Sequence, residues 1–323
     1  MTELLRIENL TVQYLLNERY VEALEDASLT VNKGDTLGIV GESGCGKSTL
    51  ALAIMGILPE NAHIKSGRIL FEGQDLLKMP QAKLRRDIRW RKISMIFQSS
   101  MNALNPVYKV GSTLMDVAEF KLKVDRDKAT AIVQRLYGLV GMDPTRLRNY
   151  PHQYSGGMRQ RAVIAMSLIC EPALIIADEP TTALDVVVQN QILKTLKKLR
   201  DELDISIVLI SHDVGVIGET CENIAVMYGG KLFETGSTKQ LFTEPNNPYT
   251  RALLNCFPDP VNPKSVLKGI PGEPPDLSAV PPGCRYAPRC TYAKEICRTK
   301  SPPFIELEPG HQSLCHFARE LSQ

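Results

Sequence analysis

The pattern of hydrophobic positions divides the chain into a long periodic part and a short irregular tail. In the long part, apolar runs of strand length alternate with segments that have a helical period. We therefore expect strands at 36–40, 93–97, 174–177 and 205–210, and helices at 50–57, 162–170 and 190–203. This alternation predicts an α/β core with a largely parallel sheet.

The two ends of the chain follow other patterns. Residues 4–7 and 27–31 are typical of an antiparallel β layer ahead of the core. Near the other end, 12 of the 21 prolines fall between Pro258 and Pro309, where neither a helical nor an alternating pattern survives. We expect the main boundary near residues 235–260, and the absence of internal repeats predicts a single copy of the core.

Composition narrows the function classes. The chain has 323 residues, 43% of them hydrophobic and 23% charged, which is ordinary for a folded globular protein. A net charge of +2 is not the excess of positive charge that is typical of nucleic-acid-binding proteins, so we expect no nucleic-acid partner. The basic segment around Trp90 is interpreted as a solvated helix.

The apolar runs are too short to span a membrane, and Glu3 stands where a secretory signal would carry positive charge. We therefore expect the chain to stay in the cytosol.

A glycine-rich segment, GESGCGKST at residues 41–49, follows the strand at 36–40 and opens the helix at 50–57. This is the context of a P-loop, in which backbone N–H groups and the helix N-terminus surround phosphates. Lys47 is expected to reach the β and γ phosphates, and Ser48 to ligate Mg²⁺. The residues expected to bind the nucleotide here are Ser43, Gly44, Cys45, Gly46, Lys47, Ser48 and Thr49.

Two further segments supply the chemistry that a P-loop needs. The apolar strand at 174–177 ends in Asp178, expected to hold Mg²⁺, and Glu179, expected to polarise an attacking water. Ser155, Gly156 and Gly157 open an apolar helix and form a second candidate phosphate-binding helix start.

These motifs, in this order, resemble the ATP-binding cassette (ABC) family of ATPases over roughly residues 4–235. The resemblance implies that Gln98 is the Q-loop glutamine at the Mg²⁺ site, that Asp185 belongs to the D-loop, and that His212 is the switch histidine. It also implies a head-to-tail dimer, in which Lys47 of one subunit and Ser155 of the other close on one ATP. An aromatic residue of the β layer would then stack on adenine, with Tyr14 as the first choice and Tyr20 as the second.

The signature segment departs from the family consensus, with Tyr154 for Leu and Met158 for Gln. Its core of Ser155, Gly156 and Gly157 is intact. A regulator that binds ATP without turnover would be expected to have lost Glu179 or His212, and neither is lost.

The segments around the cassette resemble the ATPases of bacterial dipeptide and oligopeptide importers. The similar segments are residues 99–107, which include 104–106, and residues 244–254, 269–275 and 282–290, with Asn247 where that family usually has His. The resemblance implies an ABC ATPase domain at 1–235 with a helical subdomain at about 99–165, and a small irregular Cys-rich domain at 236–323. ATPases for nickel or another small solute, and soluble ABC ATPases, are the alternatives.

The importer family implies several partners and a location. The partners are a second ABC ATPase subunit, identical or different, two membrane permease subunits and an extracytoplasmic peptide-binding protein that acts through them. The chain would lie peripherally on the cytoplasmic face of the bacterial inner membrane. ATP and Mg²⁺ are the expected ligands of the cassette.

Four cysteines gather in the proline-rich tail, separated by five, six and seventeen residues: Cys284, Cys290, Cys297 and Cys315. Four thiolates in a helix-poor segment suit a [4Fe–4S] cluster, which some members of the similar importer family carry, with Zn²⁺ as the alternative. His311 and His316 flank the last cysteine and are expected to be exposed. The remaining cysteines, Cys45, Cys170, Cys221 and Cys256, have no ligand spacing and are interpreted as small core or loop residues.

Overall fold

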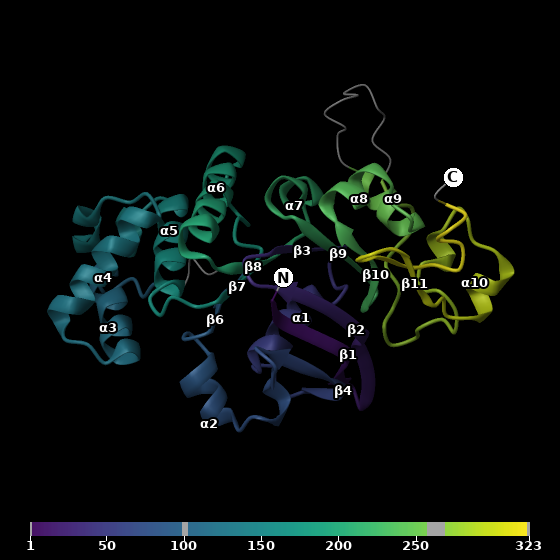
Figure 1. Cartoon of the computed structure of the whole chain (residues 1–323), viewed down its shortest axis with the longest axis horizontal. Coiled ribbons are helices and arrows are strands. Elements are labelled where there is room, and N and C mark those ends of the chain that lie inside the picture. Colours follow the sequence, from purple (N-terminus) through teal and green to yellow (C-terminus); the bar gives the residue numbers. More distant parts are fainter. Residues whose placement is uncertain (1, 99–102, 257–268, 322–323) are drawn as a thin grey trace. The chain divides into compact units, whose positions relative to one another are not determined.

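The computed structural model describes residues 2–98, 103–256 and 269–321. The chain divides into two compact units (Figure 1). The helical unit consists of Met1–Thr2, Asn32–Asp35 and Met79–Leu209, and the P-loop unit consists of Glu3–Val31, Thr36–Lys78 and Ile210–Gln323. Residues 99–102, part of one segment that resembles the importer ATPases, lie outside the described residues.

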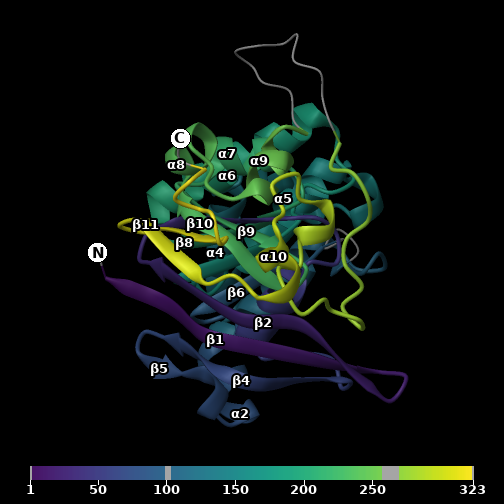
Figure 2. The same cartoon turned by 90° about the vertical axis from the view of Figure 1, so that its right-hand side faces the viewer.

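An antiparallel sheet forms the N-terminal part of the P-loop unit, with the strand order β2-β1-β4-β5 (Figure 2). Leu5 and Ile7 of β1 pair with Phe71 and Ile69 of β4, and all four side chains are at most 1% exposed. Arg6, between Leu5 and Ile7, is only partly buried, whereas the neighbouring Leu4 is 1% exposed, so both faces of β1 bury apolar side chains near its start. The strands are β1 (Glu3–Leu16), β2 (Arg19–Asn32), β4 (Ala62–Phe71) and β5 (Gln74–Asp75).

A second sheet in the P-loop unit has the order β11-β12-β10-β9-β3. Strand β3 is parallel to β9, and the remaining pairs are antiparallel. Its strands are β3 (Thr36–Val40), β9 (Asn223–Tyr228), β10 (Lys231–Ser237), β11 (Phe304–Glu308) and β12 (His311–Leu314). The helices of the unit are α1 (Lys47–Met55), α7 (Val214–Thr220), α8 (Thr238–Thr243), α9 (Pro248–Leu254) and α10 (Glu295–Thr299).

The helical unit contains the parallel strands β6 (Ile93–Ile96) and β7 (Leu174–Asp178), and β8 (Ser206–Ser211) lies beside β7. Every residue of β7 is buried, which explains its continuous apolar run. The helices are α2 (Gln81–Lys83), α3 (Val110–Leu122), α4 (Arg126–Leu139), α5 (Gly156–Ser167) and α6 (Val186–Leu203). Helices α3, α4 and α5 lie together (Figure 1).

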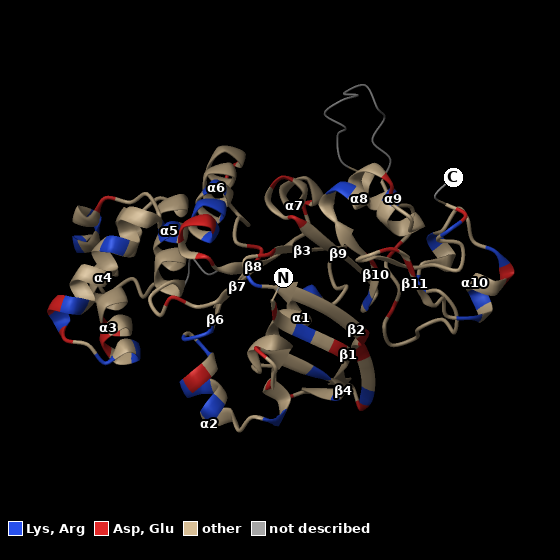
Figure 3. Ribbon diagram, in the orientation of Figure 1, with Lys and Arg blue, Asp and Glu red and all other residues tan. Residues whose placement is uncertain are grey.

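Charged residues of both signs are interspersed along the elements of each unit (Figure 3). Arg126, for example, donates to the carboxylates of Asp116 and Glu119, at 2.5 and 2.8 Å. These bonds join the first turn of α4 to α3. No helix among the described residues combines the length and the apolar character needed to cross a bilayer.

The tail is more regular than its proline content suggests. Strands β11 and β12 form a hairpin, and β12 pairs with β10, so the C-terminal segment extends a sheet of the P-loop unit. The expectation that His311 is exposed was wrong. Its ring is only 3% exposed, and Nε2 lies 2.9 Å from Oε1 of the buried Glu234 on β10. This pair fixes the hairpin to the sheet.

Candidate functional site

The glycine-rich loop turns sharply before α1. Gly44 and Gly46 have φ values of 76° and 102°, in the left-handed region that favours glycine, and Gly46 is the N-cap of α1. A Cβ on Gly46 would lie 2.5 Å from the carbonyl oxygen of Ala23, whereas a Cβ on Gly44 would meet nothing within 4 Å. Ser43, Gly44 and Ser48 are exposed. The loop therefore rests on the β layer on one side and is open on the other, where a phosphate chain fits.

Lys47 is folded into this loop. Its Nζ donates to the carbonyl oxygens of Gly41 and Glu42, at 2.8 and 2.9 Å, and the residue is only 6% exposed. Cys45 is 2% exposed, and burial raises the pKa of its thiol. This agrees with its interpretation as a small core residue. The loop thus holds a buried ammonium group, the cation needed to bind phosphate oxygens.

The two tyrosines proposed for adenine stacking differ in their surroundings. The hydroxyl oxygen of Tyr14 lies 3.4 Å from that of Thr49, at the end of the glycine-rich loop. Tyr20 is 59% exposed and its ring meets His63 edge-on, with centroids 5.1 Å apart. The structure therefore places Tyr14 beside the P-loop.

The helical unit brings together two of the three expected catalytic residues, Gln98 and Glu179. Asp178 ends β7 and is 4% exposed, and Glu179 follows with a φ of 46°. Oε2 of Glu179 accepts hydrogen bonds from Nε2 of Gln98, at 2.9 Å, and from Oγ1 of Thr182, at 3.0 Å. Gln98 and Glu179 are 81 residues apart in sequence. Sequence reasoning missed Thr182, whose only signal was a hydroxyl three residues after the glutamate.

The signature segment lies against the segment that contains Asp185. Ser155 is the N-cap of α5, and its hydroxyl accepts from the backbone N–H of Met158 at 3.3 Å. A Cβ on Gly157 would lie 2.5 Å from Cγ1 of Val188. Asp185 is the N-cap of α6 and accepts from the N–H of that same Val188 at 2.9 Å. The starts of α5 and α6 are therefore in direct contact.

Tyr154, the departure from the signature consensus, is a core residue. It is 4% exposed, and its hydroxyl donates to the carbonyl oxygen of Arg146 at 2.8 Å. The hydroxyl oxygen of the fully buried Tyr137 lies 3.2 Å away. Burial raises the pKa of both tyrosines, so both hydroxyls stay protonated. The tyrosine thus links α4 to the turn at Pro144–Arg148 and leaves Ser155 exposed.

His212 is exposed and follows β8 directly, just before Asp213, the N-cap of α7. It belongs to the P-loop unit, whereas Gln98, Glu179 and Ser155 belong to the helical unit.

Comparison with known proteins gives the family. Residues 24–182 match the family described as ABC transporter, and residues 233–297 match the C-terminal region of the oligopeptide/dipeptide transporter family. The chain is 46% identical over 300 residues to the dipeptide transport ATP-binding protein DppD of Bacillus subtilis, covering 92% of this chain and 89% of that protein. The chain belongs to the ABC transporter family. It is 42% identical over 314 residues to the oligopeptide transport ATP-binding protein OppD of Escherichia coli, covering 97% and 92% of the two chains.

Solved ABC cassettes share the fold. The dimeric bacterial ABC transporter cassette MJ0796 superimposes with a TM-score of 0.65 at 26% identity, covering 72% of this chain and 98% of that one. A second cassette, cbiO1 from Clostridium perfringens, gives a TM-score of 0.66 at 29% identity, covering 76% and 92%. The expected fold class is confirmed, and the chain is an ABC-type ATPase that binds ATP and Mg²⁺.

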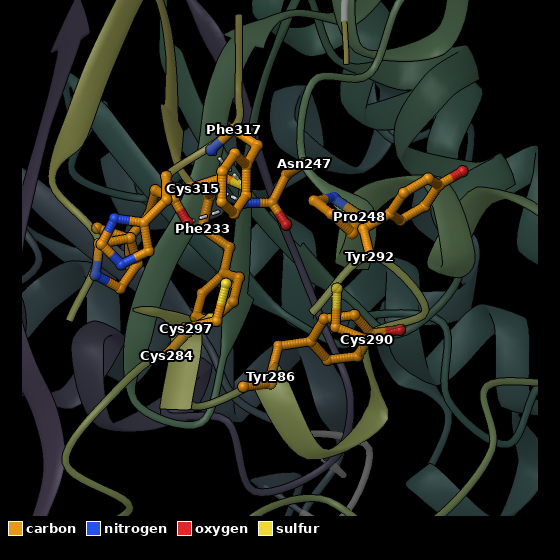
Figure 4. Close-up of a pocket in the computed structure, with 14 residues that line it drawn as sticks. Phe233, Asn247, Pro248, Cys284, Tyr286, Cys290, Tyr292, Cys297, Cys315 and Phe317 are labelled. Atoms are coloured by element: carbon orange, nitrogen blue, oxygen red, sulfur yellow. Dashed lines mark hydrogen bonds between the residues drawn. The ribbon is translucent and has the colours of Figure 1, made fainter. Parts of the chain in front are cut away.

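The expectation of a [4Fe–4S] cluster in this ABC protein was wrong. Cys284, Cys290, Cys297 and Cys315 line one small apolar pocket together with aromatic side chains (Figure 4). However, no group of three or more His, Cys, Asp or Glu side chains in the described part of the chain is arranged to hold a metal ion, which also removes the zinc alternative. Burial raises the pKa of Cys284 and of Cys315 to about 11.

Asn247, which stands where the importer ATPases usually have His, is a structural residue. It is 1% exposed, and its Nδ2 donates to the carbonyl oxygens of Phe233 and Leu314, at 3.0 and 3.2 Å. Its Oδ1 accepts from the backbone N–H of Tyr249 at 3.0 Å, which caps α9. Asn247 thus joins α9 to β10 and β12.

Proposed function

We propose that this chain is the ATP-hydrolysing subunit of a bacterial importer of dipeptides or oligopeptides. The observation that carries the proposal is the match of residues 233–297 to the C-terminal region of oligopeptide/dipeptide transporters, next to an ABC cassette. Relatives named for dipeptide or oligopeptide transport span nearly the whole chain. The proposed division is an ATPase domain at 1–235, with a helical subdomain at about 99–165, and a C-terminal domain at 236–323.

The proposed nucleotide-binding residues of the P-loop unit act on the phosphates and on adenine. When the nucleotide binds, the ammonium group of Lys47 donates to β and γ phosphate oxygens in place of the loop carbonyl oxygens. The backbone N–H groups of residues 43–49 surround the phosphates. Tyr14 stacks on adenine, a role that its position beside Thr49 supports. Ser48, Asp178 and Gln98 are the residues that would hold Mg²⁺, which would supply neutralisation of charge on the phosphate oxygens.

Glu179 is the proposed group that polarises the attacking water. Its hydrogen bonds with Gln98 and Thr182 hold the carboxylate at the end of β7. His212 is proposed to contact the γ-phosphate. Ser155, Gly156, Gly157 and Asp185 are proposed to act across a head-to-tail dimer, on the ATP bound by the other subunit.

The proposed complex contains a second ABC ATPase, two permease subunits and an extracytoplasmic peptide-binding protein. The chain would be peripheral, on the cytoplasmic face of the inner membrane. The arrangement is supported by the names of the relatives, which are ATP-binding proteins of peptide transport, and by the dimeric state of the similar cassette MJ0796.

The substitution Glu179→Gln tests this function in the assembled complex. The variant should bind ATP but hydrolyse it at less than about 1% of the wild-type rate, since the amide cannot accept a proton from water. Glu202→Gln, at an exposed position of α6, is the matched control and should hydrolyse ATP normally. Unchanged turnover in the Glu179 variant would contradict the proposed role. A wild-type complex whose hydrolysis does not respond to a peptide-loaded receptor would contradict the importer function.

A further inference from the structure

The C-terminal segment, by which we mean the proposed domain at 236–323, is hydrogen-bonded directly to the P-loop. Arg289 forms two parallel hydrogen bonds with the carboxylate of Glu42, the second residue of the glycine-rich segment. Nη1 donates to Oε2 at 2.7 Å and Nη2 donates to Oε1 at 2.9 Å. The side chain of Arg289 is only 5% exposed. An arginine that binds a carboxylate through two parallel hydrogen bonds forms one of the stronger contacts available to a protein.

The rest of the Arg289 guanidinium is also held. Nε donates to the carbonyl oxygen of Pro271 at 2.7 Å, and Nη1 also donates to the hydroxyl of Tyr228 at 3.1 Å. The hydrogen bond with Glu42 is the main cause that raises the pKa of Arg289, so the guanidinium stays charged. A planar guanidinium fixed on several sides sets the direction of the carboxylate that it binds.

Tyr249 holds the backbone of the same P-loop residue. Its hydroxyl accepts from the N–H of Glu42 at 3.1 Å, and the side chain is fully buried. Its ring packs in a cluster of aromatic side chains from β9, β10 and the tail: Tyr228, Phe233 and Tyr286. The hydroxyl is therefore a rigid partner for the loop.

All of the polar groups of Glu42 are thus engaged. Lys47 donates to the carbonyl oxygen of Glu42, Tyr249 accepts from its N–H, and Arg289 donates to its carboxylate. Two of these three partners lie in the C-terminal segment. We propose that Arg289 and Tyr249 are positioning residues that hold the P-loop in its nucleotide-binding shape. Arg289 also neutralises the negative charge that Glu42 would present to a polyphosphate. This inference rests on the proposed role of the P-loop.

A second arginine of the segment supports the loop from the neighbouring turn. Arg285, whose side chain is 2% exposed, donates to the carbonyl oxygen of Gly229 and to the carboxylate of Glu25. The N–H of Gly230, the next residue in that turn, donates to the carbonyl oxygen of Cys45 in the P-loop at 3.1 Å. The segment therefore supports the P-loop at two separate points.

Nucleotide affinity of the full-length chain tests the inference. Arg289→Ala should raise the Kd for a fluorescent ATP analogue with Mg²⁺ roughly tenfold, equivalent to about 1.4 kcal/mol. The double variant Glu42→Gln/Arg289→Ala should recover only part of this loss, because it removes the uncompensated carboxylate but leaves the loop without the two bonds to Arg289. Arg298→Ala, at an exposed position of the same segment, is the control and should bind as the wild type does.

The melting temperature is measured in parallel, because removing one member of a buried ion pair can also destabilise the fold. Arg289→Lys keeps the charge without the two parallel bonds and should raise the Kd about twofold to fivefold. By linkage, the nucleotide should slow hydrogen exchange at residues 284–290 in the wild type and less so in the Arg289 variants.

Wild-type affinity in a folded Arg289→Ala or Arg289→Lys chain would overturn the inference. A double variant that binds as weakly as Arg289→Ala would overturn the charge-neutralising role of Arg289. A wild-type chain that binds no nucleotide would contradict the proposed function as well.

Discussion

The buried hydroxyl of Tyr154 offers a test of how the signature segment is supported. Tyr154→Phe keeps the ring and removes one oxygen. That oxygen bonds the carbonyl of Arg146 at 2.8 Å and lies 3.2 Å from the hydroxyl of Tyr137. Because Tyr137 is fully buried, water cannot replace the lost partner. Leaving a buried polar group without its partner costs about 1–3 kcal/mol.

A loss of this size should lower the melting temperature of the helical unit by roughly 2–12 °C, at about 2–4 °C per kcal/mol for a unit of this size. The assay is a thermal melt of the full chain, with Tyr108→Phe as control, because Tyr108 is 59% exposed. Turnover per folded molecule should stay within about twofold, since Ser155 is untouched. A melting shift no larger than that of the control would refute the reasoning.

Three further substitutions have defined outcomes. Gly157→Ala places a methyl group 2.5 Å from Cγ1 of Val188, so the rate of ATP hydrolysis should fall about tenfold or more. The double variant Gly157→Ala/Val188→Ala should recover part of that rate. Equal rates in the single and double variants would contradict this explanation. Asp125 is the N-cap of α4, and the hydrogen bond from the backbone N–H of Lys128 lowers the pKa of its carboxyl group. The stabilisation of the fold by the Asp125 carboxylate is therefore present above about pH 4 and is lost as the pH falls through the lowered pKa. The urea midpoint of the wild type should therefore fall more than that of Asp125→Asn between about pH 5 and pH 2. A difference between the two midpoints that does not change with pH would exclude this role of Asp125. Tyr14→Ala should weaken ATP-analogue binding several-fold while Tyr20→Ala does not, and the reverse order would assign adenine stacking to Tyr20.

The strands of the core could be predicted because they are buried on both faces. Those at 36–40 and 174–178 read as continuous apolar runs, which few other structures produce. The sequence did not predict β4, because most of its first half is exposed and polar. The hairpin of β11 and β12 was also missed, since strands of five and four residues flanked by prolines carry too little pattern to stand out.

The motifs of the site were predictable because each is local. Contiguous residues define the P-loop, the end of β7 and the start of α5. The place of Gln98 in the site came only through the family resemblance, and its hydrogen bond with Glu179, 81 residues away, was not predicted. The bond between Glu42 and Arg289 spans 247 residues and joins two segments that no pattern relates. Cysteine spacing suggested four thiolates that bind a metal, but spacing does not report how the side chains are arranged, and no group of three or more His, Cys, Asp or Glu side chains among the described residues is arranged to hold a metal ion.

ATP-driven uptake of a labelled dipeptide into proteoliposomes is the most direct measurement of the central claim. The vesicles would contain this chain, its partner ATPase and the two permeases, with the binding protein on the opposite side from ATP. Uptake should require ATP, resist competition by nickel and disappear when this chain carries Glu179→Gln. ATP-driven uptake of nickel without uptake of any peptide would contradict the account.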